Sequence, residues 1–347
     1  MQQLMNYLLF SDTVFMKSRS IFFIQIIFLV SFFGCDEEDV ITIPKEPDSN
    51  ISTQSEYIAV FGDLQAYTVS KTNMKYYDAS IFWMLNEIEN GKSIKAALQV
   101  GDVTETNSMD QWNQFRCSTE SLSEVLPYYT CTGNHDYTWD KQSKVRDRNS
   151  TLINDYAHFD TTDRNIVEYY NRNSLENYVA TMEIHGEKIF LLVLEFGPRK
   201  EVLHWAKNYV ENNKNKSFIL MTHEWLTRYG QRINSWSYAE SQFSGYSTFN
   251  TPEEIWNELV APNNNIICVL CGHNGFSAKL FSENNNGRKV PQILFNLQYQ
   301  ENGGNGLIQM WEFPAKSDSV KVYAYDTINR EIYMPDSTFI SFKYKNY

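Results

Sequence analysis

Residues 57–68 read YIAVFGDLQAYT, and this stretch sets a pattern that recurs along the chain. An apolar run stops on Gly62 and Asp63, and Gln65 follows two residues later. Short apolar runs of this kind predict buried β-strands. Later runs end in the same way, on Asp102, on Asn134-His135-Asp136, on His223 and on His273.

These strand ends predict one shared site. In α/β proteins, ligands bind at the carboxyl ends of strands, where adjacent loops converge. A glycine precedes four of the polar residues, at positions 62, 101, 133 and 272. A chain that turns sharply beneath a bound ion favours a residue without a Cβ atom. Carboxylate and amide oxygens mixed with imidazole nitrogens suit Mn, Fe or Zn better than Ca or Mg alone.

The pattern of apolar residues predicts alternating strands and helices. The predicted strands are 57–62, 95–101, 127–132, 188–195, 217–222 and 266–271, and the predicted helices are 74–90, 109–126, 201–213 and 252–260. The segment Thr251-Pro252-Glu253-Glu254 is typical of a helix start. After residue 275, short runs separated by turn signals predict a second, mostly antiparallel sheet. Helices flanking two packed sheets give a four-layer α/β sandwich.

Two stretches do not follow this alternation. Residues 137–175 are polar, and we expect an irregular insertion or lid there. Residues 224–250 directly follow His223 and lack a helical or strand period. A long loop beside a ligand is usually functional, so both stretches are candidates for setting substrate specificity.

The ordered blocks GDLQ, GDVTE, GNHD, a lone His and GH resemble the calcineurin-like metallophosphoesterase family. The pattern of that family is D-x-H, G-D-x-x-D, G-N-H-D/E, a lone His, and G-H-x-H. The resemblance runs in family order from residue 63 to residue 273. It implies an αββα sandwich of two mixed sheets and two divalent metal ions bridged by an aspartate. It also implies hydrolysis of a phosphomonoester or phosphodiester.

The resemblance also implies a role for each matching residue. The implied metal ligands are Asp63, Gln65, Asp102, Asn134, His223 and His273, with Asp102 as the bridge. His135 would stand near the leaving group as a proton donor or phosphate contact, and Asp136 would orient it. Glu105 stands where the second acid of G-D-x-x-D is usual.

Two departures from the family pattern affect the first metal. Gln65 stands in place of the histidine of D-x-H, and Gly275 stands in place of the second histidine of G-H-x-H. Losing two nitrogen donors should weaken this site and shift it towards harder ions such as Mn or Mg. Glu195, which follows another strand run, and Asn274 are candidates for compensating oxygen ligands.

Arginines are the candidate phosphate contacts, because the guanidinium fork matches phosphate geometry. The candidates are Arg199, Arg228 and Arg232. The expected substrate is a phosphorylated small molecule or glycan. The formal net charge of −12 argues against nucleic-acid binding, which needs a basic surface.

The N-terminus predicts export. Residues 1–35 resemble a signal peptide with a lipobox-like end at Cys35, and Met16 is a natural start. Residues 36–55 form an acidic tether, and the catalytic domain covers 56–347. We expect an outer-membrane or cell-surface lipoprotein whose only membrane contact is the lipid anchor, with a periplasmic location or an ordinary cleaved signal as alternatives.

The remaining cysteines and histidines are expected to be structural. Cys268 and Cys271 lie three apart on a predicted strand and so face opposite sides, whereas a disulfide between Cys117 and Cys131 is left open. His158, His185 and His204 do not follow strand runs.

Two other functions remain open. One is a degenerate member that binds a phosphorylated or carbohydrate ligand without turnover. The other is a carbohydrate-binding surface that uses Trp225 and Trp236. The retained His135-Asp136 pair favours an enzyme, because a binding protein needs no proton donor.

Overall fold

Two seven-stranded sheets form the core of the computed structural model, which describes residues 55–234, 243, 249–333 and 339–345. Cys35, the predicted signal peptide and Trp236 lie outside the described residues. Within the described part of the chain, no helix is long and apolar enough to cross a membrane.

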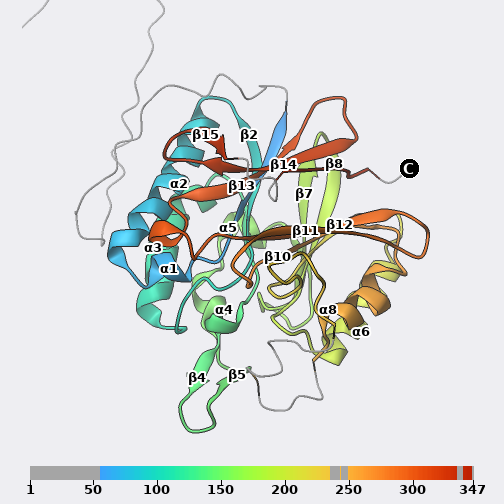
Figure 1. Ribbon diagram of the computed structural model, residues 1–347, viewed down its shortest axis with the longest axis horizontal. Coiled ribbons are helices and arrows are strands. Elements are labelled where there is room, and N and C mark those ends of the chain that lie inside the picture. Colours follow the sequence, from blue (N-terminus) through green and yellow to red (C-terminus); the bar gives the residue numbers. More distant parts are fainter. Residues whose placement is uncertain (1–54, 235–242, 244–248, 334–338, 346–347) are drawn as a thin grey trace, which may run out of the picture. The chain divides into compact units, whose positions relative to one another are not determined.

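The first sheet joins the beginning and the end of the described chain (Figure 1). Its order is β15-β14-β13-β1-β2-β3, and β16 also pairs with β14. Strands β1, β2 and β3 are parallel, whereas β13 runs antiparallel to β1. The strands are β1 (Glu56–Phe61), β2 (Ser93–Gln99), β3 (Tyr128–Thr130), β13 (Leu307–Phe313), β14 (Ser319–Asp326), β15 (Glu331–Tyr333) and β16 (Ile340–Lys343).

The second sheet has the order β11-β12-β10-β9-β8-β7-β6. Its four middle strands, β12, β10, β9 and β8, are parallel, and β11, β7 and β6 pair antiparallel. The strands are β6 (Ile166–Tyr169), β7 (Tyr178–Ile184), β8 (Glu187–Val193), β9 (Ser217–Met221), β10 (Ile266–Cys271), β11 (Phe276–Glu283) and β12 (Lys289–Asn296). Both sheets are therefore mixed, as expected for the predicted fold class.

Alternation along β8 shows how the layers pack. Ile189, Leu191 and Val193 join the cluster that contains β1 and β2, whereas Phe190 and Leu192 face the cluster that contains α6. Since successive side chains on a strand point to opposite faces, the second sheet is covered on both sides. Cys268 and Cys271 on β10 divide between the same two clusters as buried free thiols.

Helices form the outer layers, with α2 and α3 beside the first sheet and α6 and α8 beside the second (Figure 1). The helices are α1 (Gln65–Thr68), α2 (Lys71–Glu89), α3 (Met109–Ser123), α4 (Ile153–Tyr156), α5 (Asp160–Asp163), α6 (Lys200–Glu211) and α8 (Pro252–Ile255). Shorter turns are η1 (Asn134–Asp136), the π-helical η3 (Trp256–Val260) that continues α8, and η4 (Glu301–Gly303). The four-layer sandwich is confirmed.

Two expectations about the fold were wrong. The strands after residue 275 do not form a sheet of their own: β11 and β12 extend the second sheet, and β13 to β16 extend the first. The local pattern predicts strands but not partners, because the choice of partner depends on long-range packing. The stretch 137–175 is also not irregular, since it contains the hairpin of β4 (Thr138–Asp140) and β5 (Val145–Asp147), two short helices and β6.

The Cys117 and Cys131 thiols do not form a disulfide. Cys117 is exposed and Cys131 is buried, and both are free.

Two of the three remaining histidines have clear structural surroundings. His185 and Gly186, both with positive φ, form the two-residue turn between β7 and β8. His158 pairs with Asp163 on α5.

Candidate metal centre

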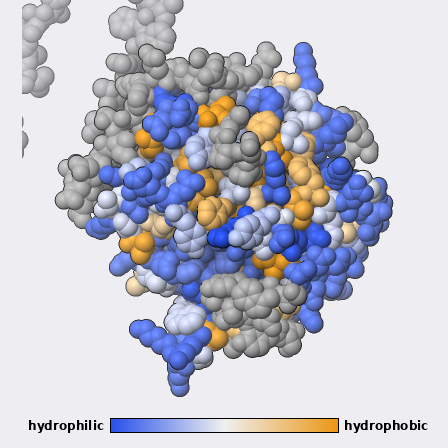
Figure 2. Space-filling view, viewed as in Figure 1, coloured by the Kyte–Doolittle hydropathy of each residue, from blue (hydrophilic) through white to orange (hydrophobic). Residues whose placement is uncertain are grey.

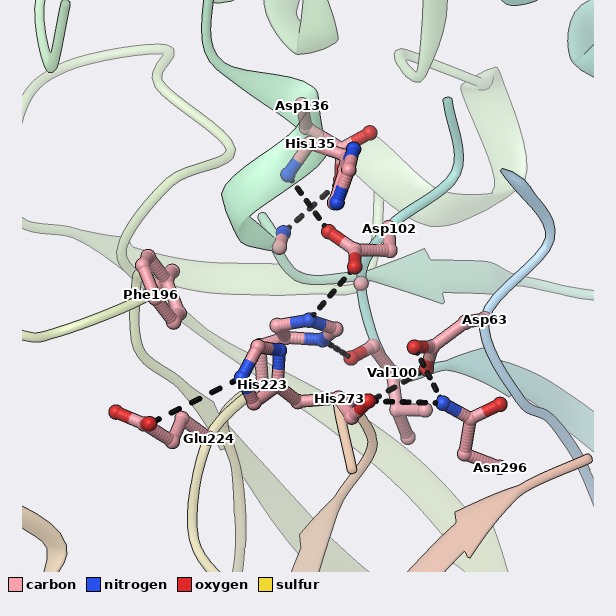
Figure 3. A network of polar contacts seen from close by, with 12 residues as sticks. Asp63, Val100, Asp102, His135, Asp136, Phe196, His223, Glu224, His273 and Asn296 are labelled. Carbon is pink, nitrogen blue, oxygen red and sulfur yellow. Dashed lines mark hydrogen bonds and ion pairs between the residues drawn. The ribbon is translucent and has the colours of Figure 1, made fainter. Parts of the chain in front are cut away.

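The predicted strand ends lie together at one edge of the sandwich. Asp63, Asp102 and Asn134 follow the parallel strands β1, β2 and β3, and His223 and His273 follow the parallel strands β9 and β10. Parallel strands end at the same edge of a sheet, so the fold gathers these side chains from segments more than 200 residues apart. Figure 3 shows the resulting network.

Asp102, His223 and His273 form the tightest group. One ligand atom from each lies within 4.8 Å of the other two. His223 Nε2 is 3.1 Å from Asp102 Oδ2, and the rings of His223 and His273 have centroids 5.0 Å apart. The Asp102 and His223 side chains are almost completely buried. Such a group of one carboxylate and two imidazoles matches the ligand chemistry of Mn, Fe or Zn.

The hydrogen bond on the far side of His223 determines its tautomer. His223 Nδ1 lies 2.6 Å from the backbone oxygen of Val100, which can only accept, so Nδ1 carries a proton. Nε2 therefore directs its lone pair towards Asp102 when the ring is neutral. Two acceptor atoms at this distance need a cation between them, either a proton or a metal ion.

The charges of the group agree with this geometry. Burial alone lowers the pKa of His223, but the carboxylates of Asp102 and Asp63 outweigh burial and raise it to about 10. Burial and the neighbouring His223 lower the pKa of His273 to about 3, which leaves this ring neutral and able to bind a cation. Burial raises the pKa of Asp102, yet His223 outweighs this and holds it well below its usual range.

Asn134 and Gln65 each contribute an unpaired acceptor. Asn134 Oδ1 and Gln65 Oε1 are buried and have no hydrogen-bond donor among the described residues. A buried polar atom without a partner is costly, and a ligand is one way to satisfy it. Asn134 lies in η1, directly before His135, whose backbone N–H donates to Asp102 Oδ1 at 2.8 Å. The residues present therefore fit a divalent metal ion.

Asp63 has a different environment. Its Oδ1 accepts from the backbone N–H of His273 at 3.2 Å. Its Oδ2 accepts from Asn296 Nδ2 at 2.5 Å and from Gln298 Nε2 at 3.1 Å. Sequence reasoning missed both amides, although Asn296 ends the apolar run of β12 in the same way as the predicted ligands end theirs.

Close backbone approach explains two of the glycines. A Cβ at Gly133 would overlap the backbone nitrogen and Oδ1 of Asp102, and a Cβ at Gly101 would lie 2.6 Å from His223 Nδ1. Both positions thus need glycine for contact with candidate ligands. The expectation that glycine lets the chain turn beneath the site is consistent with this geometry.

The predicted role of Asp136 requires a correction, whereas that of His135 stays a prediction. His135 Nδ1 lies 2.7 Å from the backbone oxygen of Glu105, so this nitrogen carries a proton and Nε2 remains for a substrate. Asp136 does not orient the ring. Its carboxylate accepts from the backbone N–H groups of Gly133, Val103 and Thr104, and so fastens the loop after β3 to the loop after β2.

Arg146 is a cation that sequence reasoning missed. Its Nη1 donates to the backbone oxygen of Tyr137. Its Nη2 lies 3.2 Å from His135 Nδ1, which cannot accept from it while it donates to Glu105. It comes from β5 in the stretch that we expected to be irregular. No strand-end signal precedes it, so the sequence pattern could not have found it.

Glu195 and Arg199 also require a correction. Arg199 donates to both carboxylate oxygens of Glu195, from Nε at 2.8 Å and from Nη2 at 2.9 Å. Asn177 and Arg148 add further contacts to the same carboxylate. The geometry therefore supports neither Glu195 as a compensating metal ligand nor Arg199 as a phosphate contact, because each satisfies the other.

The other predicted ligand contacts are Arg228, Arg232 and Trp225, and only Arg228 is exposed. Arg232 pairs with Glu253 and is not available to a phosphate. Arg228 is exposed, and its Nη2 donates to Tyr229 Oη at 2.7 Å. Trp225 is fully buried and donates to Gln292, which contradicts its predicted role on a carbohydrate-binding surface.

Asn274 connects the centre to the loop that carries Arg228. Its Nδ2 donates to the backbone oxygen of Leu226 at 2.7 Å. The arginine also lies over the ring of Phe276, with Cζ 5.6 Å from the ring centroid. Tyr229, Phe276 and Tyr299 are among the most exposed large apolar side chains described.

The fold and the centre together are those of metallophosphoesterases. The family model described as calcineurin-like phosphoesterase matches residues 57–277. The chain belongs to this family, which supports metal-dependent hydrolysis of phosphoesters as the general class of activity.

Similar proteins are more distant. The uncharacterized protein YvnB of Bacillus subtilis (strain 168) is 23% identical over 271 residues, which cover 76% of this chain and 19% of that protein. Probable inactive purple acid phosphatase 9 of Arabidopsis thaliana is 29% identical over 89 residues, which cover 24% of this chain and 14% of that protein. The chain thus spans no more than a fifth of either relative.

Among solved structures, the 5'-nucleotidase from Candida albicans SC5314 matches with a TM-score of 0.45 and 10% identity. The match covers 81% of this chain and 53% of that chain.

Proposed function

We propose that this chain hydrolyses an organic phosphoester at the Asp102 centre. The observation that carries the proposal is the buried group of Asp102, His223 and His273, with the tautomer of His223 set by Val100. Asn134 Oδ1 supplies a further atom that could coordinate a metal ion. When bound there, a divalent ion supplies Lewis-acid chemistry, which acidifies a water and offsets charge on the phosphate.

The side chains around the centre supply the remaining steps. Asp102 Oδ1 holds the backbone of His135, and the backbone oxygen of Glu105 holds its ring. In this position, His135 Nε2 can donate a proton to the leaving oxygen when the ring is charged. Asp136 keeps the two loops together, so it acts by positioning rather than by proton transfer.

Exposed side chains on the segments after His223 and His273 support a proposal for the substrate class. Most of the face in Figure 2 is hydrophilic, with apolar residues in small groups between the polar ones. Phe276 and Tyr229, with Arg228 over both rings, form one exposed aromatic group of the described surface. A guanidinium suits a phosphate, and aromatic faces suit a sugar or another ring. We therefore propose a phosphorylated sugar or similar ring-bearing ester, with Arg228 as a substrate contact.

The test is hydrolysis of bis-p-nitrophenyl phosphate and p-nitrophenyl phosphate by the metal-stripped full chain, reloaded with Mn²⁺, Fe²⁺, Zn²⁺ or Mg²⁺. We expect turnover that depends on metal and that falls at least about 100-fold in Asn134→Ala and His273→Ala. Mutating a residue that hydrogen-bonds a metal ligand lowers metal affinity or activity about 10–100-fold. Removing the ligand itself should lower activity at least as much. The preferred ester separates a monoesterase from a diesterase.

A matched control keeps the test specific. His204 is an exposed histidine on α6, and His204→Ala should leave turnover unchanged. A folded protein that binds metal but turns over neither ester would contradict the proposal. A ligand-binding protein without turnover would then be the better description, in agreement with the changes at Gln65 and Gly275.

A further inference from the structure

We propose that this chain holds a single divalent ion, at Asp102, Asn134, His223 and His273. Side chains from β12 and the turn after it take the place that a second ion would need. The proposal rests on the assignment of a metal to the Asp102 centre. It departs from the two ions that the family pattern implies.

Three of the about four acceptor sites of Asp63 are already occupied, including both sites of Oδ2. A carboxylate oxygen offers about two acceptor sites. On Oδ2 both are used, by Asn296 Nδ2 and Gln298 Nε2, and Oδ1 accepts from the backbone of His273. A metal ion at Oδ2 would have to displace one of these N–H groups, whose positive edges also repel a cation.

The orientation of Asn296 is fixed by its other contacts. Its Oδ1 accepts from the backbone N–H of Gln298 at 3.0 Å, and its Nδ2 also donates to the backbone oxygen of His273 at 3.1 Å. Turning the amide over would place oxygen against the oxygens of Asp63 and His273. The side chain must therefore present its NH₂ group to Asp63, and it cannot serve there as an oxygen ligand.

The ring of Tyr299 occupies the space beside Gly275, where the family pattern has a histidine. A Cβ atom there would overlap the ring of Tyr299. A histidine would therefore require the exposed Tyr299 ring to swing aside. In the described conformation, the Tyr299 ring therefore takes the space that a side chain at position 275 would need.

Few atoms then remain that could coordinate a second ion. Among the described residues, Gln65 Oε1 is a buried, unpaired neutral oxygen, and Asp63 Oδ1 keeps one open acceptor site. A catalytic zinc site usually has about three protein ligands, more than these two atoms supply. The Asp102 centre, by contrast, combines a carboxylate, two imidazoles and an amide oxygen.

The test counts Mn²⁺ bound to the metal-stripped full chain at saturation, by equilibrium dialysis with elemental analysis, and records the Mn²⁺ electron paramagnetic resonance spectrum. We expect one ion per chain, with the hyperfine pattern of an isolated ion. Two ions per chain, or the spectrum of an exchange-coupled pair, would overturn the proposal. No bound ion would overturn both this proposal and the assignment of the Asp102 centre.

Two variants assign the single ion to the Asp102 centre. Asp63→Asn should keep one ion per chain with affinity changed by less than about tenfold, whereas Asp102→Asn should weaken binding at least about a hundredfold. Circular dichroism checks that each variant is folded. If Asp63→Asn is unfolded, Gln298→Ala provides the comparison, because it alters the surroundings of Asp63 without changing a proposed ligand. It should also keep the ion, and a loss of the ion in a folded Asp63 or Gln298 variant would overturn the proposed ligand set.

Turnover tests the proposed function independently. A chain that binds one ion and hydrolyses the model esters satisfies both proposals. A chain that binds two ions and hydrolyses the model esters contradicts only the single-ion proposal. A chain that binds one ion but hydrolyses neither ester contradicts only the proposed function.

Discussion

Two candidate ligands have a backbone conformation that residues other than glycine rarely adopt. Asp102 has φ 52° and His273 has φ 71°. The left-handed region costs a non-glycine residue about 1–2 kcal/mol. The surrounding bonds hold these residues there: the backbone oxygen of Asp102 accepts from Leu64 and Gln65, and the backbone N–H of His273 donates to Asp63. Strain of this kind is common at functional sites.

Gly133→Ala tests the close approach at this centre. The backbone of Gly133 has φ −97°, which alanine tolerates, so any effect comes from overlap of Cβ with Asp102. We expect a loss of stability of about 1–3 kcal/mol, the usual cost of overpacking, together with weaker Mn²⁺ binding. Urea unfolding and Mn²⁺ titration measure the two effects.

Gly91→Ala is the matched control. Gly91 has φ +92°, and a Cβ atom added there would meet no other part of the described chain within 4 Å, so only backbone strain applies. The variant should lose about 1 kcal/mol of stability and keep its Mn²⁺ affinity. Unchanged Mn²⁺ binding in Gly133→Ala would show that the contact with Asp102 does not shape the centre.

The elements follow local sequence signals closely. The predicted strands 217–222 and 266–271 correspond to β9 and β10, and the predicted helix 201–213 corresponds to α6. The start of α8 is also as expected: Thr251 Oγ1 accepts from the backbone N–H of Glu254, whose carboxylate accepts in return from the backbone N–H of Thr251. These signals are local, so the sequence pattern reveals them.

Thr251→Ala tests this cap. Removing the hydroxyl leaves the backbone N–H of Glu254 without its acceptor, and we expect a loss of about 1 kcal/mol in the free energy of unfolding. Chemical denaturation measures it. Thr251→Ser keeps the hydroxyl and should retain most of the stability. Equal losses in the two variants would assign the effect to packing of the threonine methyl group.

At the scale of the whole molecule, Glu56 connects the two sheets. It lies on β1, and its Oε2 accepts from the backbone N–H of His185 in the β7–β8 turn at 2.5 Å. Lys95 on β2 lies 2.9 Å from its Oε1. Burial raises the pKa of Glu56, but the His185 hydrogen bond and Lys95 outweigh burial and lower it below its usual value.

This shift predicts a dependence of stability on pH. A carboxyl group whose pKa is lowered by folding stabilises the protein above its unfolded pKa, and this contribution is lost as the pH falls through the folded pKa. Glu56→Gln should therefore unfold more easily at pH 7, by less than about 1 kcal/mol because the pair is partly exposed. The difference from the unmodified chain should shrink below about pH 4. Urea unfolding at both pH values measures it, and a difference independent of pH would contradict the assignment.

The sequence by itself determined the strand ends, the caps and the order of the metal-binding blocks, because each is a contiguous signal of a few residues. Only the tertiary structure decided which sheet the C-terminal strands join and that Glu195 pairs with Arg199. It alone placed Asn296 against Asp63, 233 residues away in the chain. Strand pairing and side-chain orientation depend on contacts between distant segments, and a local pattern of residues carries no record of those contacts.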